Sequence, residues 1–156
     1  MGIPDGVAGV QTTLGMMAKL VKRGKTNPAI RSKAVALVQN LRQKDRLGEI
    51  DAIFRFVRDG IRYVRDINNV ETLHWPEQVM AQESGDCDDK VVLVNSLLQS
   101  IGYRTRFVAV GFSPGMFSHV LPEVQFGRYW LPLETTENVA PGWFPPNVRS
   151  CMIKAV

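Results

Sequence analysis

The chain has 156 residues, of which 45% are hydrophobic and 22% charged, the composition of one ordinary soluble domain with a sizeable core. No apolar run approaches the ~20 residues of a membrane helix, and no charged leader precedes an apolar stretch at the N-terminus. We therefore expect neither a membrane span nor a signal peptide, and a cytoplasmic location. Two cysteines far apart, Cys87 and Cys151, do not form a disulfide scaffold, which favours a reducing compartment with free thiols.

The formal net charge of +4 is unevenly distributed. Residues 1–65 hold 13 of the 19 Lys and Arg but 5 of the 15 Asp and Glu, a net charge of +8, so residues 66–156 carry −4. A solvated helical face accounts for such charge, because Lys and Arg favour helices and cover apolar surface with their stems. The alternative is an anionic partner on this basic half, such as nucleic acid, a membrane surface or an acidic protein.

The first half of the chain has helical periodicity. Residues 7–23 place apolar residues on one face, although two glycines weaken this helix. Asn27 followed by proline is a helix start signal and predicts a helix over 28–43, and a third apolar stripe runs from Asp45 to Gly60. The sequence IRYV that follows is typical of extended structure, and a loop then leads to Trp75.

The segment before Cys87 predicts a short helix, PEQVMAQ, that ends at a turn formed by Ser84 and Gly85. After Cys87 the spacing of apolar residues indicates a buried helix that ends at Gly102. The members of its stripe are Val91, Val94, Leu98 and Ile101, widened by Val92 and Leu97.

Beyond Gly102 the period changes to that of strands. The segments RTRFVAVGF, SHVLPEVQF and YWLPLETT are rich in aromatic and β-branched residues and are separated by Gly and Pro. Short connections between them predict an antiparallel meander. The proline-rich end, residues 137–156, predicts an irregular tail packed by Trp143 and Phe144. The fold class is therefore α+β, with helices first and an antiparallel sheet after them.

Cys87 occupies a chemically distinctive position. With Asp86 as the N-cap, Cys87 is the first helical residue and Asp89 has the spacing of a capping box. Unpaired amides and the helix dipole favour a thiolate there and lower the pKa of the thiol. The carboxylates of Asp86, Asp88 and Asp89 oppose this effect, so a cationic partner is needed. The alternative is a small buried thiol beside an ordinary acidic cap.

A histidine and a carboxylate fall on one face of the predicted sheet. A two-residue turn at 127–128 pairs residue 126 with 129, so Glu134 becomes the diagonal neighbour of His119, within reach of its side chain. Thiol, imidazole and carboxylate together are the nucleophile, base and orienting group of cysteine catalysis. A surface histidine beside a surface glutamate also fits this hairpin.

The segments GDCDDKVVLVNSLLQSIGYRTRFVAVG, SHVLPEV and RYWLPLETT resemble the core of the transglutaminase-like superfamily, whose fold is papain-like. FRFVRDGIRYVRD and WPEQVMAQESGDC extend the resemblance over roughly residues 50–136. It implies a nucleophile at Cys87, a general base at His119 and a third member at Glu134. The family usually has Asp at this third position, and the longer glutamate changes its reach. The compact size resembles the bacterial or phage-encoded members.

The oxyanion hole has one predicted donor and several alternatives for the second. The first is the backbone N–H of Cys87, and the second is Gln82, the Tyr63 hydroxyl or the Trp75 indole. The resemblance to papain-like enzymes favours Gln82. Each of these side chains is otherwise an ordinary surface amide or half-buried aromatic.

No metal or cofactor is expected. His74 has no second ligand at metal spacing, and we expect it to pack or to form hydrogen bonds. The cluster of Asp86, Asp88 and Asp89 departs from a calcium loop, because Lys90 follows it and neither the central glycine nor the terminal glutamate does.

We expect a single transglutaminase-like domain over residues 1–156, with a basic helical extension (1–45), a catalytic core (46–136) and the tail. The expected activity is hydrolysis of amide bonds in peptide or protein substrates, as a peptidase or amidase, through a thioester on Cys87. One alternative is acyl transfer to an amine, as in a transglutaminase. Another is a non-enzymatic binding or assembly module that uses the basic half.

Overall fold

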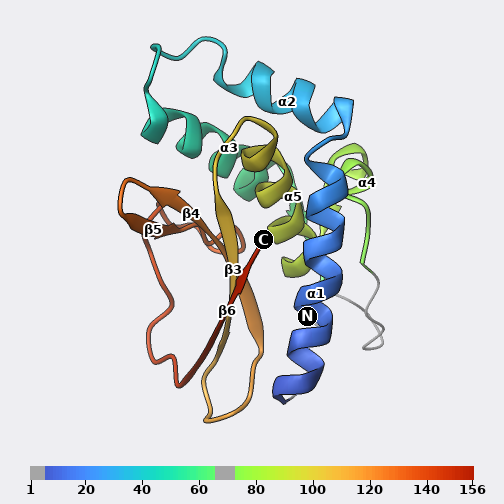
Figure 1. The fold of residues 1–156 in the computed structure, drawn as a ribbon, viewed down its shortest axis with the longest axis vertical. Helices are drawn as coiled ribbons and strands as arrows, with labels where there is room; N and C mark the ends of the chain where they lie inside the picture. The colour runs from blue at the N-terminus through green and yellow to red at the C-terminus, as the bar shows by residue number, and fades with distance from the viewer. Residues whose placement is uncertain (1–5, 66–72) are drawn as a thin grey trace.

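A computed structural model describes residues 6–65 and 73–156 of the chain (Figure 1). The helices are α1 (Val7–Gly24), α2 (Pro28–Val38), α3 (Arg46–Gly60), α4 (Pro76–Gln82) and α5 (Cys87–Ser100). The strands are β1 (Arg62–Tyr63), β2 (Ser84–Gly85), β3 (Thr105–Gly111), β4 (His119–Phe126), β5 (Tyr129–Pro132) and β6 (Ser150–Ala155). Helices precede the antiparallel sheet, so the predicted α+β class is confirmed. Within these ranges no helix is long and apolar enough to cross a membrane.

Helix α5 lies in the middle of the molecule, with the sheet on one side and α1 and α4 on the other (Figure 1). Thirteen of its 14 residues are buried, because it carries apolar residues on every face. One apolar cluster joins α5 to α2 and α3 through residues such as Ile30, Phe54 and Leu97. A second joins its N-terminal turn to α1 and the sheet. This central position fixes the first turn of α5, where Cys87 lies.

The predicted helix starts are confirmed by their caps. The Asn27 side chain accepts hydrogen bonds from Ala29 N at 2.9 Å and Ile30 N at 3.3 Å, which satisfies two amides of the first turn of α2. This helix ends at Val38 rather than at the predicted 43. The residues that follow are polar apart from Leu41, which is 36% exposed, so further turns would cover no core surface.

The four-stranded sheet has the order β5-β4-β3-β6 and is antiparallel throughout. Phe126 pairs with Tyr129 across the turn at residues 127–128, so the predicted hairpin register is confirmed. The tail differs from the prediction for residues 137–156. Residues 137–149 contain neither helix nor strand, but Ser150–Ala155 form β6 along the open edge of β3. This strand forms because it pairs with the free edge of β3, a long-range contact that local sequence patterns do not predict.

A second, two-stranded sheet lies next to α5. Strand β1 pairs in parallel with β2, which matches Arg62 with Ser84 and Tyr63 with Gly85. The predicted turn at residues 84–85 is therefore wrong. The backbone is extended in both segments, and two hydrogen bonds join them. Arg62 N donates to Glu83 O at 2.8 Å, and Val64 N donates to Gly85 O at 2.9 Å. This pairing brings Tyr63 beside the residues that lead into Cys87. The loop expected before Trp75 lies partly outside the described residues.

Candidate active site

The turn that carries Cys87 is a complete capping box. Asp89 N donates to the Asp86 side chain at 2.9 Å, and Asp86 N donates to the Asp89 side chain at 3.2 Å. A Cβ at Gly85 would lie 2.7 Å from the Cβ of Asp89, so only glycine fits against this box. Cys87 is therefore held as the first residue of α5, with 1% of its surface exposed.

The surroundings of Cys87 favour the neutral thiol. Burial raises the pKa of the Cys87 thiol well above its usual value, and the carboxylates of Asp88 and Asp86 raise it further. The thiol also donates to Asp88 Oδ1 at 3.7 Å. The predicted lowering of this pKa by the helix terminus is wrong, because desolvation and two adjacent carboxylates outweigh the helix dipole. Attack by this sulfur requires a base.

His119 and Glu134 lie against one another, as the hairpin register predicted. His119 Nε2 is 2.5 Å from Glu134 Oε2, and the carboxylate is 2% exposed. Burial alone would raise the pKa of Glu134, but hydrogen bonds from His119 and Thr136 lower it. Because an ionised carboxylate only accepts hydrogen bonds, Nε2 carries the hydrogen of this bond, and in a neutral imidazole Nδ1 then holds the lone pair.

Strand β4 links this pair to the thiol. Val120 directly follows His119, and its backbone lies near enough to the Cys87 thiol to lower the pKa of that thiol slightly. Val120 and Cys87 also belong to the same apolar cluster. His119 and Cys87 therefore occupy neighbouring positions, one at the start of β4 and the other at the start of α5.

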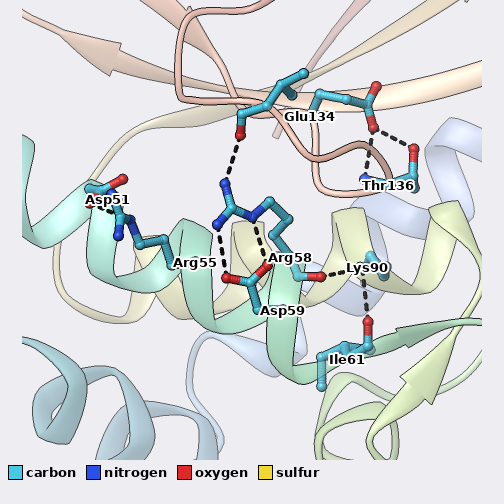
Figure 2. A network of polar contacts seen from close by, with 9 residues as sticks. Asp51, Arg55, Arg58, Asp59, Ile61, Lys90, Glu134 and Thr136 are labelled. Atoms are coloured by element: carbon cyan, nitrogen blue, oxygen red, sulfur yellow. Dashed lines mark hydrogen bonds and ion pairs between the residues drawn. The ribbon is translucent and has the colours of Figure 1, made fainter.

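The second carboxylate oxygen of Glu134 is held by Thr136, and sequence reasoning did not single out this residue. Glu134 Oε1 accepts from Thr136 N at 3.0 Å and from Thr136 Oγ1 at 2.7 Å (Figure 2). Glu134 lies beyond the end of β5, and these two hydrogen bonds hold its carboxylate in place. A threonine two residues after an acidic residue is the signal that could have found this contact.

The three side chains considered as second oxyanion donors lie in different surroundings. Tyr63 lines the cavity that His119 and Glu134 also line, and burial followed by the nearby Cys87 raises the pKa of its phenol. The Gln82 amide donates to Ser84 O at 2.9 Å, and the guanidinium of Arg23 lies 4.2 Å from the centre of the Trp75 ring. Gln82 and Trp75 are absent from the cavity wall.

A cavity of about 890 Å³ opens beside the imidazole–carboxylate pair. One part of its wall is polar, with Tyr63 at the end of β1, Arg65 two residues after it, Ser118 and Glu137. The other part is apolar and comes from the loop after β3 and from residues 143–147 of the tail. Its apolar members are Phe112, Trp143, Pro145 and Pro146. Trp143 therefore lines this cavity, whereas Trp130 lies under the guanidinium of Arg106.

Lys90 is a buried cation one turn after Cys87 that sequence reasoning did not explain. Its Nζ donates to Ile61 O at 2.8 Å and to Arg58 O at 3.2 Å, which ties α5 to the end of α3 (Figure 2). Burial lowers its pKa from 10.5 to about 8, although Asp59 and Glu134 oppose the change. Arg58 in turn donates to Val139 O at 2.9 Å, in the segment that follows Glu134. A lysine inside an apolar helix was the available signal.

His74 and Cys151 do not line this cavity. His74 Nδ1 lies 3.2 Å from Asp89 Oδ2, so the expected hydrogen bonding is confirmed. Cys151 is an exposed thiol on β6. Across residues 6–65 and 73–156, no group of three or more His, Cys, Asp or Glu side chains could hold a metal ion.

A sequence profile described as "Transglutaminase-like superfamily" matches residues 20–135, about three quarters of the chain. The chain belongs to the transglutaminase-like superfamily. This match contains the capping box of α5, strand β4 and Glu134. No functionally curated protein sequence matches the chain significantly.

Two solved structures have a similar fold. A candidate protease from Parabacteroides distasonis superposes with a TM-score of 0.62 at 14% identity, over 78% of this chain and 26% of that one. A candidate cysteine protease from Cytophaga hutchinsonii gives a TM-score of 0.60 at 15% identity, over 91% of this chain and 52% of that one. The chain thus spans about a quarter and about half of these two proteins, and the likeness is one of fold.

Proposed function

We propose that the protein is a cysteine-dependent hydrolase of amide bonds in peptides or proteins, with Cys87 as nucleophile, His119 as base and Glu134 as the orienting carboxylate. The observation that carries the proposal is the short contact between His119 Nε2 and Glu134 Oε2, at the start of a strand whose next residue, Val120, packs in the same apolar cluster as Cys87. Family membership and the similar fold of the candidate cysteine protease from Cytophaga hutchinsonii support a cysteine hydrolase.

The proposed reaction begins from the neutral thiol. As Cys87 Sγ attacks the amide carbonyl carbon, the thiol proton passes to His119 Nδ1, and Glu134 stabilises the imidazolium. His119 then gives this proton to the leaving nitrogen as the C–N bond breaks, which leaves a thioester and a free amine. Water attacks the thioester, its proton passes through His119 to the sulfur, and the carboxylic acid departs.

The carbonyl oxygen becomes negative in both tetrahedral intermediates and needs hydrogen-bond donors. The backbone N–H of Cys87 belongs to the first turn of α5, where amides have no intrahelical acceptor. For the second donor we favour the Tyr63 hydroxyl over Gln82 and Trp75. Tyr63 lines the cavity, and it lies close enough to Cys87 that a thiolate there would raise the pKa of its phenol. The Gln82 amide, in contrast, already donates to a carbonyl.

The test is a mass-spectrometric assay on a mixture of synthetic peptides, run in ¹⁸O-labelled water with and without methylamine. We expect cleaved peptides with ¹⁸O in the new carboxyl group from the wild-type protein and from Cys151→Ala, and none from Cys87→Ala. A methylamide product in place of the acid would identify the alternative, transglutaminase-type transfer, which shares the same thioester. Cleavage that survives in Cys87→Ala would reject the proposal.

An anionic partner on the basic helical half is a second candidate role. Lys44, Arg46 and Arg104 line a separate hollow of about 480 Å³, in which the carboxylate of Glu49 accepts from Tyr103 at 2.5 Å. Three cations around one paired carboxylate favour an anion there. If they bind one, the affinity for heparin as a model polyanion falls steeply as salt increases, and Arg46→Ala, in the basic half, lowers that affinity. Absence of binding at low salt would reject this role.

A further inference from the structure

Hydrogen bonds hold the loop after β3, which contributes to the apolar part of the cavity wall. Arg149 N donates to Gly111 O at 2.8 Å, immediately before Phe112. Ser150 Oγ donates to Ser113 O at 2.8 Å and accepts from Gly115 N at 2.7 Å. The loop that carries Phe112 is thus fastened to the start of β6, and its geometry is set before any ligand binds.

The opposite end of this wall is fastened in the same way. Gly142 N donates to Pro132 O at 2.9 Å, which attaches the tail to the end of β5 just before Trp143. A Cβ at Gly142, whose φ is 99°, would touch Leu131 at 3.5 Å. The chain therefore turns at a glycine and brings Trp143 to the cavity.

Two aromatic side chains remain exposed in this fastened wall. Phe112 is 47% exposed and Trp143 is 37% exposed, and both line the cavity that His119 lines. Exposed aromatic surface in a preformed hollow is the common feature of ligand sites. Pro145 and Pro146 continue the wall, and because proline has no N–H they offer no backbone donor to an added strand. This wall therefore suits a side chain of a bound peptide rather than its backbone.

The charges around the cavity do not select a charged side chain. Arg65 and Glu137 have opposite signs, and Glu134 already accepts from His119. The apolar surface is therefore the selective feature. We propose that Phe112 and Trp143 form the subsite for a bulky apolar side chain, aromatic or large aliphatic, next to the amide bond that is cleaved. This inference rests on the proposed function for the meaning of the adjacent bond, but it concerns binding and can be tested without turnover.

The experiment uses Cys87→Ala protein and fluorescein-labelled heptapeptides that differ only at the central residue, which is Phe, Leu, Ser, Asp or Lys. Fluorescence anisotropy measures Kd. Burial of a Phe or Leu side chain predicts Kd values about tenfold lower for these two peptides than for the Ser peptide. Phe112→Ala and Trp143→Ala should each reduce this preference by about threefold or more, with little effect on the Ser peptide.

Tyr129→Ala is the matched control, since Tyr129 is an aromatic residue with 70% exposure on β5 outside the cavity. It should leave the preference unchanged, and Trp143→Phe should retain most of it. Equal affinity for all peptides, or a preference that survives both alanine variants, overturns the inference. A preference that disappears in both alanine variants supports it even if the wild-type protein cleaves no peptide, an outcome that rejects the proposed function alone.

Discussion

Replacing Lys90 with Met tests the buried cation network around the site. The side chain is 1% exposed, and methionine keeps its length while removing the ammonium. Removing the ammonium leaves the carbonyls of Arg58 and Ile61 without this donor, which costs about 1–3 kcal/mol for each buried group. It also removes the cost of burying a charge, which the change of pKa from 10.5 to about 8 sets at ~3 kcal/mol. The two effects nearly cancel at neutral pH.

The pH dependence separates these two effects. Between the folded pKa of Lys90, about 8, and the unfolded value of 10.5, the unfolded chain binds a proton that the folded protein does not. The wild-type protein therefore gains stability from Lys90 as pH rises through this window, by about 2 kcal/mol between pH 7 and roughly pH 9.5. Lys90→Met lacks this gain, whereas the other titrating groups affect both proteins alike.

Urea unfolding of both proteins at these two pH values measures the difference. We expect the stability of Lys90→Met relative to wild type to fall by about 2 kcal/mol from neutral to alkaline pH. An equal difference at both pH values would show that Lys90 titrates normally, and the account of a desolvated ammonium would be wrong.

Three further predictions follow from the site and the helix caps. Asp88→Asn should raise the rate at which iodoacetamide alkylates Cys87 at neutral pH severalfold, because it removes a carboxylate that raises the thiol pKa. An unchanged rate, measured by site-resolved mass spectrometry, would contradict this prediction. Glu134→Gln should lower kcat/KM by about a hundredfold or more, and Glu137→Gln, in the same cavity wall, by less than about twofold, with equal losses counting against the orienting role. Asn27→Ala should lower the free energy of unfolding by about 1 kcal/mol in urea titrations, and no change would mean that the cap of α2 contributes nothing.

Local patterns in the sequence were sufficient for most helices and for the hairpin. The Asp86–Asp89 capping box and the Asn27 cap are contacts between near neighbours, so spacing alone predicts them. The register of β4 and β5 follows from a two-residue turn, and it correctly brought Glu134 to His119.

Features that depend on distant segments were beyond the reach of such patterns. Strand β6 forms because β3 offers a free edge, and β2 forms because β1 lies beside it. The sign of the shift in the Cys87 pKa depends on desolvation, which is set by the packing of α1 and the sheet around the thiol. Lys90 has its role because the end of α3 presents two carbonyl oxygens to it.

In the proposed reaction Cys87 is the nucleophile and His119 its base. A peptide aldehyde, which forms a reversible thiohemiacetal, and a peptide vinyl sulfone, which alkylates irreversibly, report on this directly. With the vinyl sulfone we predict one adduct by intact mass, located on Cys87 by peptide mapping, blocked by prior addition of the aldehyde and reduced at least about a hundredfold in His119→Ala. An adduct located on Cys151, or labelling of Cys87 at the same rate in His119→Ala, would contradict these two roles.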